Sequence, residues 1–172
     1  MAEGLRYWAV VPAAGVGRRM GADIPKQFLE LGDRTVLECS LDALFSMDLL
    51  DGLVLVSSDA GAVGQITGGY TGRNLMRASG GKERCHSVLN GLQVLAGCAA
   101  PDDWVLVHDA ARPCVRTSDL DLLVKIVSGS EDGGLLGMPV HDTIKRADGS
   151  GLITGTLERE GMWRAFTPQM FR

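Results

Sequence analysis

The chain has 172 residues, 45% of them hydrophobic, with a formal net charge of -4 and an isoelectric point near 5.3. This length is that of one domain able to bury a continuous core. The acidic balance excludes a general electrostatic attraction to nucleic acid or anionic lipid, so a phosphate ligand must be held by locally placed basic groups. We therefore expect a small-molecule partner and no nucleic acid.

Short apolar runs alternate with segments of helical periodicity along the chain. The runs at 7–12, 53–57, 104–107 and 134–140 are typical of buried strands in a parallel sheet. Between them, 3.6-residue periodicity predicts helices, and their expected buried faces hold Leu37, Leu41, Leu44 and Phe45; Val88, Leu92 and Leu95; and Leu120, Leu123, Val124 and Val127. This alternation predicts an α/β fold with a mostly parallel sheet and helices on both faces. Ligands of such sheets lie beyond the carboxyl ends of the strands, so the loops after Pro12 and Val107 are the expected site.

The segment from Asp142 to Thr156 departs from this alternation. It is polar and is centred on Asp148-Gly149, a turn pair typical of a hairpin. We expect a protruding arm at about 141–160, attached to a single domain spanning 1–172. The chain stops at Arg172 directly after an apolar cluster and without a polar tail, which is the pattern of a fragment.

The start of the chain does not indicate export, and the spacing of the cysteines does not indicate a metal motif. The first seven residues include Glu3 and Arg6 and form no continuous apolar segment, and no later apolar run is long enough to cross a bilayer. The sequence thus predicts a cytoplasmic protein with no membrane partner. The four cysteines are scattered: Cys39, Cys85, Cys98 and Cys114. Because no C-x-x-C pair exists, a structural zinc site or redox motif is not expected, and we predict buried or inert thiols.

The loop after the first apolar run combines small residues with cations. It reads P-A-A-G-V-G-R-R-M at 12–20, followed by P-K-Q at 25–27. Small residues let backbone N–H groups approach a phosphate, and the cations can neutralise a triphosphate. The spacing fits neither G-x-x-x-x-G-K-[ST] nor G-x-G-x-x-G, because Met20 stands where the third glycine would be. Taken alone, G-x-G is more often a tight turn, and Arg19 and Lys26 are more often solvated charges.

Five ordered segments nevertheless resemble one family. They are A-A-G-V-G-R-R-M with P-K-Q, G-G-K-E-R-C-H-S-V at 80–88, V-H-D-A-A-R-P at 107–113, D-T-I-K-R at 142–146 and T-P-Q-M-F at 167–171. Together they resemble the 2-C-methyl-D-erythritol 4-phosphate cytidylyltransferases of the non-mevalonate isoprenoid pathway, whose second segment reads G-G-x-x-R-x-x-S-V. The resemblance implies a three-layer Rossmann-like nucleotidyltransferase fold. It also implies transfer of the cytidylyl group of CTP to 2-C-methyl-D-erythritol 4-phosphate with release of pyrophosphate.

The same resemblance implies a role for each matching position. Arg19 and Lys26 would be catalytic, contacting the triphosphate and stabilising the pentacoordinate phosphorus. Positions implied to bind CTP are Pro12, Ala13, Ala14, Gly15, Gly17, Gly81, Lys82, Ser87, Asp109 and Ala110. Positions implied to bind the polyol phosphate are Arg112, Thr143, Arg159 and Thr167. Mg²⁺ or another divalent cation would be held mostly by the triphosphate, with Asp109 as a further candidate ligand. Family members are dimers with clasping arms, so Thr143 and Arg159 are expected to complete the neighbouring subunit's site.

Simpler interpretations stand beside these roles. The hydroxyl of Ser87 could satisfy the backbone near a helix, and Asp109 could form a buried pair with Arg112. His108 is expected to be a structural histidine rather than a general base. Because the histidines lack H-E-x-x-H spacing and no G-x-S-x-G segment exists, hydrolase chemistry has no basis in this sequence.

Two alternative functions remain open at this stage. One is a related alditol-phosphate cytidylyltransferase, such as a ribitol 5-phosphate enzyme, which shares the glycine-rich loop and P-K-Q. The other is an inactive nucleotide-binding or dimerisation fragment. It is motivated by the resemblance, since family chains continue past T-P-Q-x-F and carry a late lysine that contacts the reacting phosphates.

Overall fold

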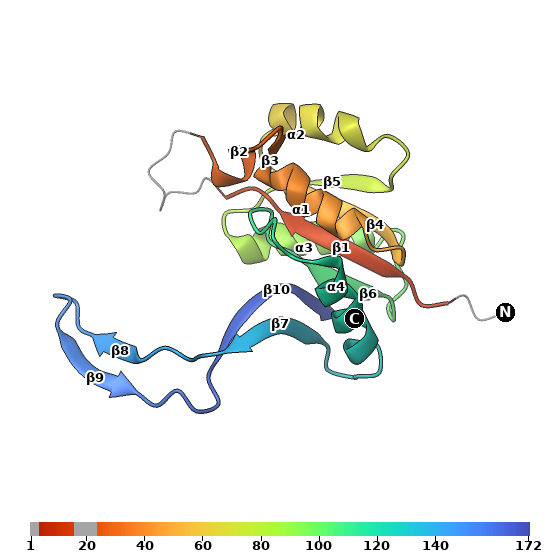
Figure 1. Cartoon of the computed structure of the whole chain (residues 1–172). Coiled ribbons are helices and arrows are strands. Elements are labelled where there is room, and N and C mark those ends of the chain that lie inside the picture. Colours follow the sequence, from red (N-terminus) through yellow and green to blue (C-terminus); the bar gives the residue numbers. More distant parts are fainter. Residues whose placement is uncertain (1–3, 16–23) are drawn as a thin grey trace.

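A computed structural model describes residues 4–15 and 24–172 of the chain, and Figure 1 shows how their elements are arranged. The central sheet has six strands in the order β5-β4-β1-β6-β10-β7. Four of them run parallel: β1 (Tyr7–Pro12), β4 (Leu50–Ser57), β5 (Leu75–Ser79) and β6 (Trp104–Val107). β10 (Trp163–Phe171) is antiparallel to both β6 and β7 (Gly134–Pro139). The mostly parallel sheet is therefore confirmed.

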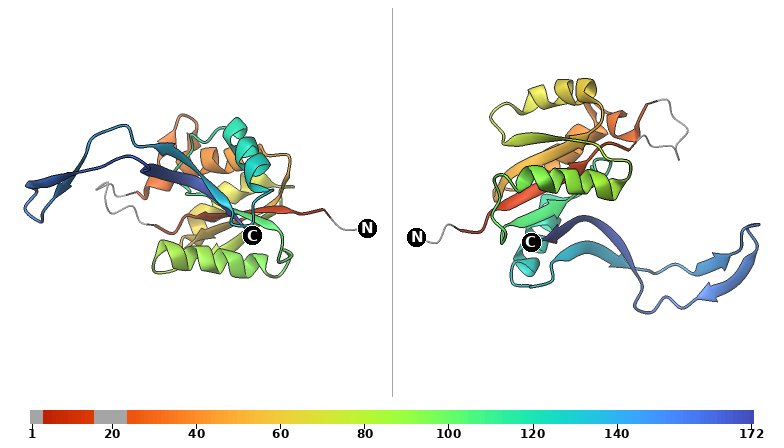
Figure 2. Two further views of the ribbon diagram at one scale, coloured as in Figure 1. Left: turned by 90° about the horizontal axis from the view of Figure 1, so that it is seen from below. Right: turned by 180° about the vertical axis from the view of Figure 1, so that it is seen from behind.

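Helices cover both faces of this sheet, as predicted. α1 (Val36–Phe45), α2 (Ala60–Thr67) and α4 (Thr117–Val127) pack on one face, and α3 (Arg84–Leu95) packs on the other (Figure 2). The alternation of side chains along β1 divides its residues between the two cores. Ala9 and Val11 belong to the cluster with α1, α2 and α4, whereas Trp8 and Val10 belong to the cluster with α3. The result is a three-layer α/β architecture.

Local signals explain where α1 begins. Thr35 accepts a hydrogen bond from the Glu38 N–H through its hydroxyl at 3.2 Å, and the Glu38 carboxylate accepts the Thr35 N–H at 2.6 Å. This reciprocal capping box satisfies two N–H groups that the first turn would leave unpaired. Just before it lie two short antiparallel strands, β2 (Glu30–Leu31) and β3 (Arg34–Thr35), and the 3₁₀ turn η2 (Lys26–Phe28). A second 3₁₀ turn, η3 (Gly68–Tyr70), follows α2.

The buried face of α3 differs from the predicted one. Its buried residues are Ser87, Gly91 and Leu95, while Leu92 is 38% exposed and Val88 is only partly buried. The reason is close packing: a Cβ on Gly91 would lie 2.6 Å from Val10 Cγ1 and 3.0 Å from Val56 Cγ2. The helix therefore lies on the sheet along Ser87 and Gly91 together with the predicted Leu95, and apolar periodicity does not identify the two small residues.

The predicted hairpin arm is confirmed. β8 (Ile144–Ala147) and β9 (Ile153–Leu157) pair in an antiparallel fashion and project away from the sheet in all three views (Figures 1 and 2). At its turn, the carboxylate of Asp148 accepts hydrogen bonds from the hydroxyl and N–H of Ser150 and from the N–H of Leu152. The Ser150 hydroxyl, followed by these N–H groups, lowers the pKa of Asp148. The turn therefore prefers an ionised aspartate.

Candidate active site

The loops that leave the carboxyl ends of β1, β4 and β5 meet at one glycine. A Cβ on Gly80 would lie 2.4 Å from the Cβ of Ala14 and 2.3 Å from the hydroxyl of Ser58. The Gly80 N–H also donates to the carbonyl of Ser57 at 3.2 Å. Any larger residue would push these loops apart. Gly80 therefore fixes the second motif against the glycine-rich loop of the first.

A buried glutamine holds the start of the glycine-rich loop. Gln27 is 4% exposed, and its Nε2 donates to the carbonyl of Ala13 at 2.7 Å and to that of Gly15 at 3.0 Å. The N–H of Ala13 in turn donates to the carbonyl of Val56 in β4 at 2.7 Å. The N–H of Ala13 therefore ties the loop to β4, and the carbonyls of Ala13 and Gly15 tie it to the P-K-Q segment.

The second motif has an internal hydrogen-bond network. The N–H of Gly81 donates to the hydroxyl of Ser87 at 3.0 Å, and that hydroxyl lies 3.3 Å from the carbonyl of Glu83, to which it donates. A Cβ on Gly81 would lie 2.4 Å from the Cβ of His86, so the position has room for glycine only. Ser87 is buried, and the simpler interpretation of its hydroxyl as a partner of nearby backbone is confirmed.

Asp109 joins the second motif to the third. Its Oδ1 accepts from Nε of Arg84 at 2.8 Å and its Oδ2 from Nε of Arg112 at 3.0 Å. The pair with Arg112 that the simpler interpretation offered is present, but it is not buried, because the two side chains keep 45% and 30% exposure. Partial burial acts to raise the pKa of Asp109, but the hydrogen bonds and charges of Arg84 and Arg112 outweigh it, so the pKa lies below its usual value. Asp109 is therefore a carboxylate that organises two guanidinium groups.

His108 is fully buried and links the third motif to β10. Its Nε2 lies 3.1 Å from the carbonyl of Arg112 and its Nδ1 lies 3.1 Å from the hydroxyl of Thr167, which accepts the N–H of Asp109 at 3.2 Å. A carbonyl can only accept, so Nε2 carries the proton and Nδ1 accepts the Thr167 hydroxyl. Burial lowers the pKa of His108. The histidine is thus neutral and structural, as predicted.

Comparison with known proteins agrees with this arrangement. The family model described as IspD, 2-C-methyl-D-erythritol 4-phosphate cytidylyltransferase, matches residues 7–172. The chain belongs to this family. The cytidylyltransferase of Pseudomonas putida strain GB-1 is 50% identical over 167 residues, which cover 96% of this chain and 71% of that protein. The one of Hahella chejuensis is 47% identical over 168 residues, which cover 97% and 69%.

Solved structures of the cytidylyltransferase family share the fold. A crystal structure of a 4-diphosphocytidyl-2C-methyl-D-erythritol synthase aligns with a TM-score of 0.87 at 35% identity, covering 99% of this chain and 76% of that one. The Francisella tularensis 2-C-methyl-D-erythritol 4-phosphate cytidylyltransferase aligns with a TM-score of 0.81 at 31% identity, covering 97% and 72%. The predicted Rossmann-like nucleotidyltransferase fold is confirmed. Among the described residues, no helix has both the length and the apolar character that a bilayer span requires.

The remaining nucleotide positions implied by the cytidylyltransferase resemblance fall into three groups. Lys26 is exposed at the start of η2 and Lys82 is exposed before α3. Pro12 ends β1, and Ala110 is buried, its carbonyl accepting the hydroxyl of Ser40 at 2.9 Å. Gly17 and Arg19 lie outside the described residues.

The residues implied to bind the polyol phosphate are not gathered at one place. Arg112 and Thr167 belong to the network around Asp109 and His108, with Thr167 only 7% exposed. Thr143 and Arg159 lie exposed in the arm, where a guanidinium nitrogen of Arg159 donates to the carbonyl of His141 at 2.7 Å. The arm leads away from the sheet (Figure 1). A single copy of the chain thus presents these residues in two separate places.

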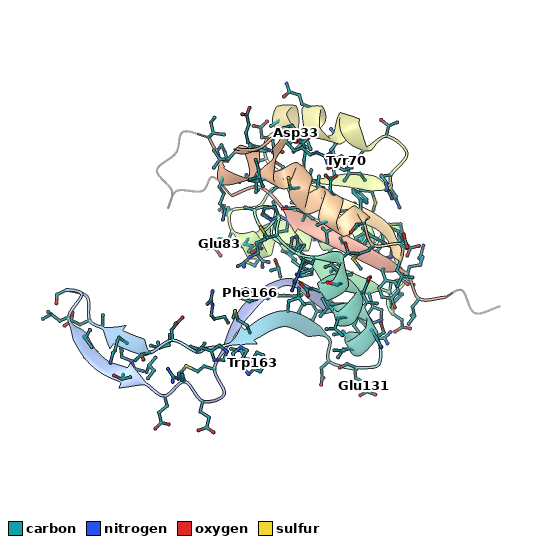
Figure 3. The ribbon with its side chains drawn as sticks, viewed as in Figure 1. Asp33, Tyr70, Glu83, Glu131, Trp163 and Phe166 are labelled. Atoms are coloured by element: carbon teal, nitrogen blue, oxygen red, sulfur yellow. The ribbon has the colours of Figure 1, made fainter. Side chains whose placement is uncertain are left out.

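Sequence reasoning missed three contributors to this site. Gln27 and Arg84 were present in the P-K-Q and G-G-x-x-R motifs, so the signal existed, but it gave no partner for either side chain. Phe166, labelled in Figure 3, was not identified at all. The guanidinium groups of Arg112 and Arg164 lie 5.9 and 5.7 Å from its ring centroid, within cation–π range. Phe166 thus brings Arg164 of β10 close to Arg112.

The prediction of buried or inert thiols is wrong about burial, and the inertness of the thiols stays a prediction. Cys85, Cys98 and Cys114 are exposed and Cys39 is partly exposed. For Cys85 the cause is the face of α3 that packs on the sheet: with Ser87, Gly91 and Leu95 turned inward, the residue at position 85 faces solvent.

A cavity of about 200 Å³ occurs elsewhere in the described part of the chain. It lies between α2 and the β4–β5 edge and is lined in part by Ser57, Asp59, Arg77 and Ser79. None of the described residues predicted to form the site lines it. The cluster of motif loops, and not this cavity, is therefore the candidate active site.

Proposed function

We propose that this chain transfers the cytidylyl group of CTP to 2-C-methyl-D-erythritol 4-phosphate, giving 4-diphosphocytidyl-2-C-methyl-D-erythritol and pyrophosphate for isoprenoid precursor synthesis. Membership of the cytidylyltransferase family supports the reaction. The observation that carries the proposal for this chain is the meeting of three motifs: Gly80 packs on Ala14, and Arg84 pairs with Asp109. These contacts support a shared site because the loops expected to hold the triphosphate and the base lie together with the segment that contains Asp109 and Arg112.

The chemistry needs positioning and charge stabilisation rather than a covalent intermediate. A phosphate oxygen of the polyol attacks the α-phosphorus of CTP; a new P–O bond forms while the bond to the leaving pyrophosphate breaks. Arg19 and Lys26 stabilise the negative charge of the pentacoordinate phosphorus, and the small residues Ala13, Ala14, Gly15 and Gly17 let the backbone of the loop approach the triphosphate closely. Gln27 supports this by holding the carbonyls of Ala13 and Gly15, which fixes the start of the loop before CTP binds.

Base selection is assigned to the second motif. Gly81 and Ser87 contact the cytosine, with Ala14 and Lys82 beside them. The room at Gly81 is limited by the Cβ of His86, and a pocket built from backbone groups and small residues favours a single-ring base. Pro12 and Ala110 complete this part of the site as backbone at the strand ends.

A divalent cation, in the cell Mg²⁺, accompanies CTP. A single carboxylate beside a triphosphate is a donor set that Mg²⁺ uses, and Asp109 is the carboxylate at hand. Each of its oxygens already accepts one guanidinium N–H and keeps a second lone pair, so a cation bound directly would share the carboxylate with Arg84 and Arg112. When bound, the cation neutralises charge on the triphosphate.

The polyol phosphate is assigned to two subunits. Arg112 and Thr167 come from the chain that holds CTP, while Thr143 and Arg159 come from the arm of a second copy. Guanidinium groups and hydroxyls suit a phosphate monoester. The dimer is supported by the projecting arm, whose Leu152 and Ile153 are 68% and 66% exposed. An isolated hairpin with exposed apolar side chains gains stability from a partner.

The decisive experiment measures pyrophosphate release from CTP and Mg²⁺ with 2-C-methyl-D-erythritol 4-phosphate, and with ribitol 5-phosphate in parallel. We expect turnover with the first and little with the second. Lys26→Ala should lose about 10²-fold in kcat, by analogy with removal of a preorganised oxyanion donor. Lys125→Ala, at an exposed lysine in the last turn of α4, is the matched control and should be unchanged. CTP binding without any turnover would instead support a nucleotide-binding fragment.

A further inference from the structure

Three potential metal ligands gather at the first turn of α3. The carboxylate of Glu83, the thiol of Cys85 and the imidazole of His86 are all exposed, and one ligand atom from each lies within 4.8 Å of the other two. Glu83 occupies the N-cap position of the helix, and its position at the surface is labelled in Figure 3. The proposed reaction assigns no task to any of these three side chains.

The three ligand atoms lie near enough to one another to close around one metal ion after a small movement. With metal–ligand bonds of about 2.0–2.3 Å, neighbouring ligand atoms stand about 3.5 Å apart, so the three side chains have to approach by roughly 1 Å. Exposed side chains make such a movement by small rotamer changes. Glu83, Cys85 and His86 lie within four consecutive residues, so one short segment at the start of α3 supplies all three ligands.

Within the part of the chain that the structure describes, the Glu83 carboxylate and the Cys85 thiol make no strong hydrogen bond or ion pair. Glu83 makes no side-chain hydrogen bond to the helix N–H groups although it occupies the N-cap. The Cys85 Sγ lies 3.7 Å from Glu83 Oε2, a weak contact. Arg84, which separates the two ligands in sequence, has its Nε bonded to Asp109.

The chemistry of the three ligands selects the metal. Thiolate and imidazole favour zinc and related soft or borderline ions, and not Mg²⁺, which prefers oxygen ligands. The positive end of the helix dipole opposes a cation here, but the thiolate and the carboxylate together balance the two charges of the ion. Three protein ligands leave a fourth position for water.

We propose that Glu83, Cys85 and His86 form a binding site for one zinc-like divalent ion, separate from the Mg²⁺ that accompanies CTP. The G-G-x-x-R-x-x-S-V pattern does not specify positions 83, 85 and 86, so the site is argued from this chain's own residues and not from the motif. It stands independently of the proposed reaction, because binding requires neither CTP nor turnover.

The test is zinc titration of the full chain in competition with a chromophoric chelator, in the absence of nucleotide. Wild type should bind one tightly held zinc, and Cys85→Ser and His86→Ala should each weaken it at least tenfold. Glu83→Gln should weaken it less, since an amide oxygen can still ligate. Cys98→Ser and Cys114→Ser, at the other two exposed thiols, are the matched controls and should bind zinc as wild type does.

Cobalt supplies a second readout that does not depend on affinity. Co²⁺ bound through a thiolate gives a sulfur-to-metal absorption band, which should be present in wild type and absent in Cys85→Ser. Binding should also weaken as pH falls, because the thiol must lose its proton to ligate. Equal zinc affinity in Cys85→Ser and Cys98→Ser, or a thiolate band that survives Cys85→Ser, overturns the proposal.

Discussion

Removing the Gln27 side chain tests whether the glycine-rich loop works because it is held in place. Gln27→Ala deletes two hydrogen bonds, to the carbonyls of Ala13 and Gly15. Ala13 is 3% exposed, so its carbonyl loses its partner without access to bulk water, whereas Gly15 is exposed and can be hydrated. A buried carbonyl left unpaired costs about 1–3 kcal/mol, and a hydrated one costs little. We therefore expect a loss of about 2 kcal/mol in the free energy of unfolding.

The same substitution should lower kcat/KM if the loop must be preorganised to hold the triphosphate. A cost of about 2 kcal/mol carried into the transition state corresponds to a fall in kcat/KM of roughly 30-fold. Gln27→Glu should be worse, because a carboxylate oxygen would then face two carbonyls where an amide N–H had donated. The assay is pyrophosphate release below the unfolding temperature, with urea unfolding of the same variants.

A matched control separates the loop from a general effect of glutamine removal. Gln93 is exposed on α3, so Gln93→Ala should keep wild-type activity and stability. If Gln27→Ala kept kcat/KM within twofold of Gln93→Ala, the loop would not depend on this side chain and the reasoning would be refuted.

Other features yield further measurable outcomes. The pKa of Asp109 is depressed in the fold, so its contribution to stability is present above the unfolded value of about 4 and is lost as pH falls through the folded pKa. Urea unfolding of Asp109→Asn should therefore show a shallower acid loss than wild type, and identical slopes would contradict this. Burial lowers the pKa of His108, so the unfolded chain binds the proton more readily and stability should decline as pH falls below about 6.5. Nitrogen NMR should find the neutral Nε2–H form at pH 6, with its Nδ1 shift altered in Thr167→Val; a charged ring at that pH would refute the assignment. Replacing Leu152 and Ile153 by aspartate should turn a dimer into a monomer in light scattering, and an unchanged mass would exclude the arm as the dimer contact.

The elements that could be predicted are those whose neighbours are near in sequence or whose composition is extreme. Continuous apolar runs coincide with β1 and β6, because both strands are covered on both faces. β5 was not predicted because it is an edge strand with a polar pattern around Arg77. α2 was not predicted because its glycines and alanines give no clear apolar periodicity. The position of β10 between β6 and β7 depends on contacts made across the whole sheet, which no local pattern encodes.

The candidate site divides in the same way. The rule for parallel sheets predicted the loops after Pro12 and Val107, and the family resemblance implied that the segment with Gly81 and Ser87 joins the first of them. The contact of Gly80 with Ala14 agrees with the second expectation. Which side chains bind which partners could not be predicted, since the ion pair between Arg84 and Asp109 depends on the height of α3 above the sheet. Ser87 illustrates the limit: its local hydrogen bonds could be anticipated from backbone chemistry, while its role toward cytosine stays a prediction.

Gly91 sets the distance between α3 and the sheet, because its side chain is a single hydrogen atom where the two elements meet. With Val10 Cγ1 only 2.6 Å from where a methyl group would begin, substitution by alanine has to lift α3 or tilt it. Four residues separate Gly91 from Ser87 along α3, so even a slight tilt of the helix displaces the turn that we propose contacts the base. In such a scaffold, nucleotide preference can evolve through substitutions at the contact between α3 and the sheet, without any change in a residue that touches the substrate.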